Sequence, residues 1–255
     1  MEKLLNFNNH AKNLFSAVDL HTFNIFSVKE ATKENELVST VTYIFAKENL
    51  FDKLAIKNEK FVACVRKLQQ SYKPITYHNK THAADLAQNF YYLCSYGELK
   101  QKCQLDSYDM MIYILAAACH DLGHPGYNNI FLIEKKDCIA IRYNDISVLE
   151  NYHIASSFDI ISKAEFNIFE EMSNDEVKRV RKQMIGAVLA TDMTFHFAKI
   201  GILKGKFSSS DIDPTSDSEK RFICEQLFHL CDIANSTKDF PVCEKWINLL
   251  FNEFF

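Results

Sequence analysis

Five residues whose side chains can bind metals or transfer protons fall in two short stretches of this sequence. YHNKTHAAD contains His78 and His82, and HDLGHPG contains His120, Asp121 and His124. Imidazole and carboxylate groups are costly to gather in a fold unless a cation or a proton transfer stabilises them. Residues four apart lie on one face of a helix, and both histidine pairs have this spacing. We therefore expect each pair to share a helix face.

A divalent cation is the simplest partner for these groups. Burying Asp121 beside His120 without a cation would cost several kcal/mol. Imidazole nitrogens with carboxylate oxygens suit Zn²⁺ and, with more water ligands, Mg²⁺ or Mn²⁺. In FHLCDIANSTK, Asp232 follows an apolar stretch on another expected helix, where it is the natural fourth ligand. Asp121 could also bridge to a second ion, and paired ions promote the hydrolysis of phosphoesters.

Such a site needs ligands from several helices, and the composition favours helices. The 255 residues include only 6 Gly and 4 Pro, too few for many short strands and their turns. Apolar positions recur at helical spacing in 38–50 and 61–68. Segment 109–123 is apolar nearly all round, as in a helix buried within a bundle, and Pro125 with Gly126 should end it.

The later part of the chain continues the helical pattern. We expect further helices near 147–163, 174–200, 218–232 and 240–255. The polar stretch 203–220 is rich in Ser and Asp, so we expect an exposed loop there.

Length, charge and cysteine content limit the classes of protein that this chain can be. With 47% hydrophobic residues, the chain can bury one sizeable core, so we expect one compact domain. The net charge is −4 without basic blocks, which argues against nucleic acid and favours a small-molecule partner. The longest apolar run, 110–119, is shorter than the roughly 20 residues that cross a bilayer. We therefore expect a soluble protein. The eight cysteines form no CxxC pair, which suits a reducing compartment, so we expect a cytoplasmic location.

Five sequence blocks carry a resemblance to a known family. The order H…HD…D resembles the HD hydrolase superfamily. Within it, the chain resembles the catalytic domain of class I cyclic nucleotide phosphodiesterases in the successive blocks YHNKTHAADL, HDLGHPGYNN, RYNDISVLENYH, VLATDM and HLCDIANSTK. The resemblance runs from about residue 60 to the last residue. It implies an all-α, compact multi-helix bundle in which 1–255 form one catalytic domain, with 1–59 as an N-terminal helical subdomain and 60–255 as the metal-site core.

The resemblance also implies roles for individual residues. A first metal, usually zinc, is bound by His82, His120, Asp121 and Asp232, and Asp121 bridges to a second metal, usually magnesium, with Mn²⁺ as an alternative. His78 is implied as the general acid that protonates the O3′ leaving group, and Glu253, 21 residues beyond Asp232, as the residue that orients it. Residues that hold ligands or waters in place are His124, Glu150, His153, Thr191 and Asp192. Tyr77 and Asn235 are implied to contact the substrate.

Some of these positions have simpler interpretations. Glu150 and His153 are three apart, so an exposed helical pair would give the same spacing. His196 lies four residues from Asp192, and we expect a local pair there rather than a metal ligand. His229 either supports Asp232, three residues further on, or packs in the core.

Two departures from the family pattern limit what the resemblance implies. The chain reads ANSTK where the family commonly has SNPTK, so Ser236 stands in place of a proline. Phosphodiesterase domains also continue well beyond the position of Glu253, with a glutamine and a phenylalanine that hold the purine. We therefore expect a domain truncated at its C-terminus. Apolar residues meant to pack on that continuation would be exposed, favouring a homodimer or aggregation through Leu249, Leu250, Phe254 and Phe255.

Three functional hypotheses follow. The first is an enzyme that hydrolyses a cyclic nucleotide to the 5′-monophosphate. The second is a metal-binding but catalytically weak fragment that acts as a nucleotide sink or interaction partner, and the third is hydrolysis of another phosphoester. The presence of both His78 and Glu253 favours the enzyme. YNNIFLI and RYNDISVLEN look most like the cGMP-preferring branch, but the preference between cAMP and cGMP stays open.

Overall fold

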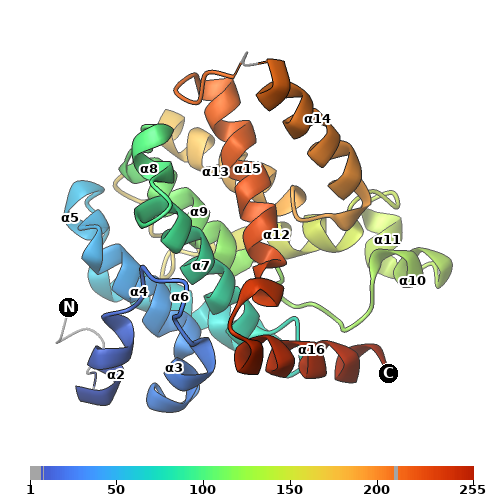
Figure 1. Ribbon diagram of the computed structural model, residues 1–255, viewed down its shortest axis with the longest axis horizontal. Coiled ribbons are helices and arrows are strands. Elements are labelled where there is room, and N and C mark those ends of the chain that lie inside the picture. Colours follow the sequence, from blue (N-terminus) through green and yellow to red (C-terminus); the bar gives the residue numbers. More distant parts are fainter. Residues whose placement is uncertain (1–6, 8, 210–211) are drawn as a thin grey trace.

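The computed structural model describes residues 7, 9–209 and 212–255, and every regular element among them is a helix (Figure 1). The all-α prediction is confirmed. The helices before the HDLGHPG segment are α2 (Asn9–Phe15), α3 (Ile25–Ala31), α4 (Glu36–Lys47), α5 (Leu50–Lys53), α6 (Asn58–Ser71), α7 (Lys80–Ser95), α8 (Leu99–Lys102) and α9 (Ser107–Cys119). Those after it are α10 (Asn129–Glu134), α11 (Cys138–Arg142), α12 (Val148–Ile161), α13 (Asn174–Leu189), α14 (His196–Ser209), α15 (Asp217–Asp232) and α16 (Phe240–Phe254), with the 3-10 helices η1 (Met193–Phe195) and η2 (Ala234–Thr237).

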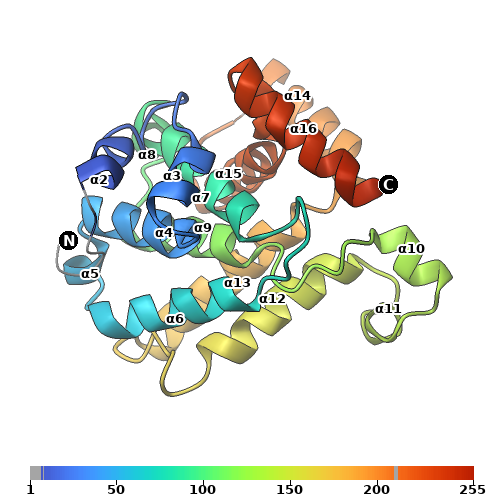
Figure 2. The ribbon, with the colours of Figure 1, turned by 90° about the horizontal axis from the view of Figure 1, so that it is seen from below.

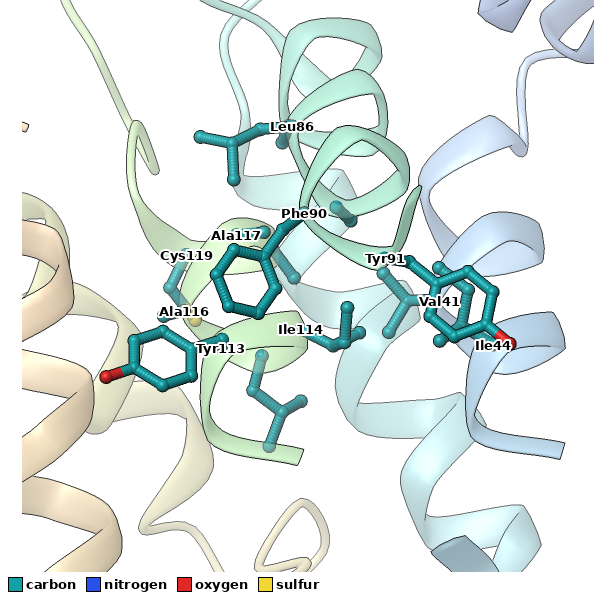
Figure 3. Packing of buried hydrophobic residues seen from close by; sticks show 14 of the residues in the cluster. Val41, Ile44, Leu86, Phe90, Tyr91, Tyr113, Ile114, Ala116, Ala117 and Cys119 are labelled. Carbon is teal, nitrogen blue, oxygen red and sulfur yellow. The ribbon is translucent and has the colours of Figure 1, made fainter. Parts of the chain in front are cut away.

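Two helices, α7 and α9, form the centre of the bundle. They pack against each other, and α4 and α15 also pack on α7 while α13 packs on α9. Figure 3 shows Phe90 of α7 beside Tyr113 of α9, and their rings stack with centroids 4.9 Å apart. Every residue from Asp109 to Cys119 is buried. Each large apolar side chain removed from water contributes about 1.5–3 kcal/mol, so the C-terminal end of α9 is a firmly held position.

Local hydrogen bonds fix where the central helices begin. The Asn79 side chain accepts a hydrogen bond from the Thr81 backbone and caps α7. At the start of α9, Asp106 and Asp109 form a reciprocal capping box in which each side chain accepts from the other's backbone N–H. These caps determine where both helices begin and therefore where their polar residues lie along each helix.

The central helix is shorter than expected. The sequence predicts helix over 109–123, but α9 ends at Cys119 and His120 is its C-cap. Gly123 has a φ of +75°, which a right-handed helix cannot contain. His124 therefore lies in the turn beyond the helix, and the expectation that His120 and His124 share a helix face is wrong.

The expected helix over 174–200 is also wrong, because the chain bends within it. Helix α13 ends at Leu189, and the side chain of Asp192 accepts from the Thr194 backbone to start η1 and then α14. Helix α14 continues to Ser209, so the first part of the expected loop 203–220 is helical, and α15 starts within its last part. Residues 210 and 211 of that stretch lie outside the described residues. The helices expected near 147–163, 218–232 and 240–255 are confirmed as α12, α15 and α16.

One large hydrophobic cluster spans most of the described chain. It includes Phe15 and Val41 from the first helices as well as Phe228 and Trp246 from the last ones. The expected division between 1–59 and 60–255 stays a prediction, and part of its first segment, residues 1–6 and 8, lies outside the described residues.

Among the described residues, no single helix combines the length and apolar composition that crossing a membrane requires. The bent pair formed by Asn174–Leu189 and Met193–Ser209 meets that test only when its two arms are taken together.

Candidate metal centre

Four side chains from three helices meet at one point. His82 lies in the first turn of α7, His120 and Asp121 follow α9 directly, and Asp232 is the last residue of α15. One ligand atom from each lies within 4.8 Å of the others. His82 Nε2 is 2.8 Å from Asp232 Oδ1, and His120 Nε2 is 3.0 Å from Asp121 Oδ2. The fold thus brings together the four residues that the sequence indicates as ligands.

The hydrogen bonds of His120 show that this cluster fits a cation. Its Nδ1 donates to the carbonyl of Ala117 at 2.9 Å, so Nε2 of the neutral ring is an acceptor. That nitrogen faces carboxylate oxygens of Asp121 and Asp232, 3.0 and 3.2 Å away. His120 Nε2 and Asp121 Oδ2 are both buried without a hydrogen-bond partner. Acceptors that face each other need a proton or a cation between them, and two imidazoles with two carboxylates are a suitable zinc ligand set.

The charges of the cluster are strongly coupled. Burial lowers the pKa of His120, but the negative charges of Asp121 and Asp232 outweigh burial and hold that pKa well above its ordinary value. Burial raises the pKa of both carboxyl groups, and His120 outweighs this effect and keeps each below its ordinary value. Without a metal the cluster is therefore an ion-pair group, in which a cation would replace the imidazole proton.

His78 and Glu253 form a second pair beside the cluster. His78 Nδ1 is 2.5 Å from Glu253 Oε1, while Glu253 Oε2 accepts from the backbone N–H groups of Tyr77 and His78 at 2.7 and 3.1 Å. Burial lowers the pKa of His78, but the bond to Glu253 and the nearby Asp121 charge outweigh it, so the net shift is upward. His78 precedes Asn79, the N-cap of α7, so the expected helix face shared with His82 is wrong.

Two further histidines extend this arrangement. The His124 ring stacks on His78 with centroids 4.2 Å apart, and its Nδ1 accepts from the Gly126 backbone at 3.0 Å. His153 donates from Nδ1 to the Leu122 carbonyl at 2.8 Å, which leaves Nε2 3.8 Å from Asp121 Oδ1. Burial lowers the pKa of His124 to about 3 and that of His153 to about 4, so both rings are neutral near pH 7. One ligand atom each from Asp121, His124 and His153 also lie close enough together to hold an ion.

Glu150 and His153 do not form an exposed helical pair. His153 is buried, and Glu150 accepts two hydrogen bonds from the Asn129 amide at 3.0 and 3.3 Å. Burial raises the pKa of Glu150 to about 7, and Asn129 opposes that rise. Asn129 is not among the predicted site residues, although it lies in the HDLGHPGYNN block. It links α10 to α12 because it also accepts from the Leu149 backbone.

Thr191 and Asp192 lie at the bend between α13 and η1. Thr191 is buried and donates to the Val188 carbonyl at 2.8 Å. Asp192 is buried and accepts from the Ser147 hydroxyl at 2.7 Å, so it joins this bend to the start of α12. The expected local pair between Asp192 and His196 is wrong, because His196 Nδ1 lies 2.7 Å from His229 Nε2 on α15.

Tyr77 and Asn235 contact each other. The Asn235 amide donates to the Tyr77 hydroxyl. The Tyr77 ring is buried between His82 and Trp246, with centroids 4.8 and 5.4 Å away. Their contact joins η2 to the segment just before α7, next to the ligand cluster.

Comparison with known proteins identifies the family. The family model described as 3'5'-cyclic nucleotide phosphodiesterase matches residues 77–255. This chain is a member of that family. It is 34% identical over 227 residues to the human "High affinity cGMP-specific 3',5'-cyclic phosphodiesterase 9A", covering 87% of this chain and 37% of that protein. It is also 34% identical over 246 residues to the Bos taurus "Dual specificity calcium/calmodulin-dependent 3',5'-cyclic nucleotide phosphodiesterase 1B", covering 95% of this chain and 45% of that protein.

The phosphodiesterase chain described here thus spans less than half the length of these curated relatives. The family match begins at Tyr77 and includes each of the four converging residues as well as His78 and Glu253. Family membership makes metal dependence the expected chemistry of the cluster.

Proposed function

We propose that this chain hydrolyses 3′,5′-cyclic nucleotides to 5′-monophosphates with two divalent metal ions as cofactors. The observation that carries the proposal is the His78–Glu253 pair beside the four predicted ligands. The His78 and His82 ring centroids are 5.9 Å apart, so a proton donor and a cation ligand are within reach of one bound phosphodiester.

The predicted ligands are His82, His120, Asp121 and Asp232 for a first ion, with Asp121 shared with a second. Zinc is the better match for the first ion because two imidazole nitrogens are available. Magnesium or manganese suits the second, since these ions prefer carboxylate oxygens and water as ligands. Divalent ions at such a site polarise phosphoryl oxygens and lower the pKa of bound water.

His78 is the proposed general acid. Its Nδ1–H is held by Glu253, so Nε2 is the nitrogen that can give a proton to the O3′ oxygen as the P–O3′ bond breaks. Water adds to phosphorus in the same reaction, which gives the 5′-monophosphate and a free 3′ hydroxyl. Glu253 is a positioning residue that keeps the ring oriented and protonated.

Five buried or half-buried groups are proposed to hold ligands and waters in place. His153 and Asp192 each bond to a neighbouring turn or helix, which limits the movement of the elements that carry the ligands. The other three are His124, Glu150 and Thr191.

The proposed substrates are cGMP, cAMP or both. One relative is named cGMP-specific and another dual-specificity, so both nucleotides are candidates for this chain. Tyr77 and Asn235 are the proposed nucleotide contacts, supported by their position beside the ligand cluster.

The test is turnover of each nucleotide by the metal-loaded chain. The protein is incubated with cGMP or cAMP and the 5′-monophosphate is followed by chromatography, beside the variant His78→Ala. We expect turnover of at least one nucleotide and a loss of about 10²–10⁴-fold in the variant. Metal-loaded protein that turns over neither nucleotide would favour the alternative, a metal-binding but weak fragment that acts as a sink or interaction partner.

We also propose a cytoplasmic location and a single catalytic domain with residues 1–59 as a helical subdomain. Eight free cysteines, most of them buried, support a reducing compartment. A homodimer is proposed through the outer face of α16, where Phe254 and Phe255 are exposed. Leu249 and Leu250, which the sequence analysis also expected to be exposed, are partly buried against the core.

A further inference from the structure

A pocket separate from the ligand cluster lies between α10, α11, α12 and the segment that follows α6. It has a volume of about 370 Å³, within the range of about 300–1,000 Å³ typical of small-molecule sites. Figure 2 shows α10 and α11 together at one end of the molecule, beyond α12. None of the lining residues belongs to the His/Asp cluster, and Gly123 and Pro125 of the HDLGHPG turn form part of the wall.

The polar groups of this pocket favour an anion. Lys73 and Lys135 both line it, and neither ammonium group has an ion-pair partner among the described residues. The one acidic group, Asp137, is already engaged because its Oδ1 accepts from the Ile139 backbone at the start of α11. The Lys135 ammonium also lies 5.6 Å from the centroid of the Phe131 ring. Two lysines without an ion-pair partner and one aspartate leave the pocket net positive, so it is complementary to a phosphate or carboxylate.

The rest of the lining favours a flat apolar group. The rings of Tyr127 and Phe131 stack with centroids 4.4 Å apart and an interplanar angle of 19°. Tyr127 is 53% and Phe131 37% exposed, so both rings offer surface to a ligand. Leu132 and Ile139 add aliphatic walls. A planar aromatic ring would gain both stacking and removal of apolar surface from water here.

Tyr152 of α12 forms another part of the pocket wall, next to Gly123. A Cβ atom added at Gly123 would lie 3.1 Å from the Tyr152 hydroxyl and 3.2 Å from its ring, so only glycine lets this tyrosine lie so close to the turn. The hydroxyl makes no hydrogen bond within the part of the chain that the structure describes. The hydroxyl is therefore a third possible hydrogen-bond donor to a bound anion, besides Lys73 and Lys135.

We propose that this pocket binds a planar aromatic anion, a ring that carries a phosphate or a carboxylate. The anionic group pairs with Lys73 and Lys135, and the ring packs on Tyr127 and Phe131. An anion alone would leave the rings of Tyr127 and Phe131 exposed to water. An aromatic ring alone would leave Lys73 and Lys135 without a counterion. The site is additional to the proposed phosphodiester chemistry and does not depend on it.

The experiment is a calorimetric titration of the full, metal-loaded chain with 1-naphthyl phosphate. We expect saturable binding that persists in Asp232→Asn, and in that background the double variant Lys73→Gln/Lys135→Gln should weaken it about tenfold or more, since charge-assisted hydrogen bonds are lost. Tyr127→Ala should weaken binding of 1-naphthyl phosphate by a smaller factor than the double lysine variant does, because it removes one aromatic contact. The matched control is Lys102→Gln, which removes one exposed positive charge on α8 and should leave binding unchanged. Circular dichroism and thermal unfolding of each variant show that it is folded.

Parallel titrations measure the contributions of the anionic group and of the ring. They also distinguish binding in the pocket from binding at the His/Asp cluster. Inorganic phosphate and 1-naphthol should each bind at least tenfold more weakly than the joined molecule, while 5′-GMP and 1-naphthoate distinguish a nucleotide from an aromatic carboxylate. The variant Asp232→Asn should bind 1-naphthyl phosphate as the parent does. Binding that survives the double lysine variant, binding lost in Asp232→Asn, or no binding of any of the three aromatic anions overturns the proposal.

Discussion

A general acid must hold a proton at the working pH, and the contacts of His78 supply that condition. Burial alone would lower the pKa of His78, but the carboxylate of Glu253 reverses the shift. Glu253 is itself fixed by two backbone N–H groups, so it cannot turn away from the ring. The protonation of the proposed general acid therefore depends on a contact with Glu253, which lies 175 positions away in the sequence.

The variant Glu253→Gln tests this contact. Removing the negative charge lowers the pKa of His78, and since the acid works in its protonated form, activity should be lost at a lower pH. We expect the alkaline limb of the kcat/KM profile to move to lower pH and kcat at neutral pH to fall about 10²-fold. The measurement is a pH–rate profile with the better nucleotide. An unshifted alkaline limb would show that Glu253 does not act through His78.

The resemblance to the phosphodiesterase family, rather than residue types and spacing alone, selected the four predicted ligands, and neither predicted the conformation of their surroundings. His82, His120, Asp121 and Asp232 lie in one cluster, as expected. The partner of His196 could not be predicted, because a contact between η1/α14 and α15 depends on a bend that hydrophobic spacing does not encode. Asn129 carries no signal of its own, since an asparagine near a glycine reads as a turn residue.

At the scale of elements, α16 brings Glu253 to the site. Its only buried residue is Trp246, which is 1% exposed and packs against Phe26 and Tyr77 with centroids 4.7 and 5.4 Å apart. The rest of the helix has exposed or partly exposed side chains, of which Leu249 and Leu250 also contact the core. Trp246 is therefore the most deeply buried contact of the element that positions the proposed general acid.

Replacing Trp246 with alanine should loosen this contact. We expect a loss of about 3–5 kcal/mol in the free energy of unfolding, as for other large aromatic residues removed from a core, and a fall in turnover as Glu253 loses its position. Ile247→Ala, on the same helix but 44% exposed, should change stability by less than about 0.5 kcal/mol. Denaturant unfolding of both variants is the measurement. Equal stability of Trp246→Ala and Ile247→Ala would contradict this role of Trp246.

The start of α9 is held by charge as well as by its capping box. Arg179 of α13 donates to Asp106 at 2.9 Å and to Asp109 at 2.7 Å. Burial raises the pKa of Asp106, and the bond to Arg179 outweighs it, so the net shift is downward. A carboxyl group with a lowered folded-state pKa stabilises the fold above its unfolded pKa of about 3.9, and this contribution is lost as the pH falls through the folded-state value.

The variant Asp106→Asn keeps a good N-cap and removes the charge. Because Asp106 is half exposed, we expect it to be less stable than the parent by no more than about 1 kcal/mol at pH 7. The difference should shrink towards zero as the pH falls below the folded-state pKa. Unfolding free energies measured across the acid range check this. A difference that stays constant with pH would show that the pair with Arg179 contributes no charge-dependent stability.

Helix identity was more predictable than helix ends. The helices at 148–161 and 240–254 were both predicted, although only the second has its apolar residues on one side. The end of α9 at Cys119 depends on a positive φ at Gly123, and a sequence rich in alanine gives no sign of it. The bend at Asp192 likewise arises from a side-chain cap, which competes with helix continuation only in the folded context.

For the whole molecule, the exposed apolar surface has a testable consequence. Phe251, Phe254 and Phe255 are 55%, 62% and 98% exposed on and after α16. A cluster of this kind favours self-association. We expect sedimentation velocity to show concentration-dependent dimers that the double variant Phe251→Ser/Phe254→Ser reduces. A monomer at all concentrations in the parent chain would contradict the proposed dimer.

The central claim concerns the whole fold, because α7, α9 and α15 are proposed to share one cation through His82, His120, Asp121 and Asp232. Metal content per chain, measured by inductively coupled plasma mass spectrometry after purification and dialysis against trace zinc, tests it most directly. We predict at least one divalent ion per parent chain, and its loss in Asp232→Ala and His120→Ala but not in the exposed control Glu98→Ala. A parent chain without bound metal, or Asp232→Ala and His120→Ala variants that retain it fully, would contradict the account.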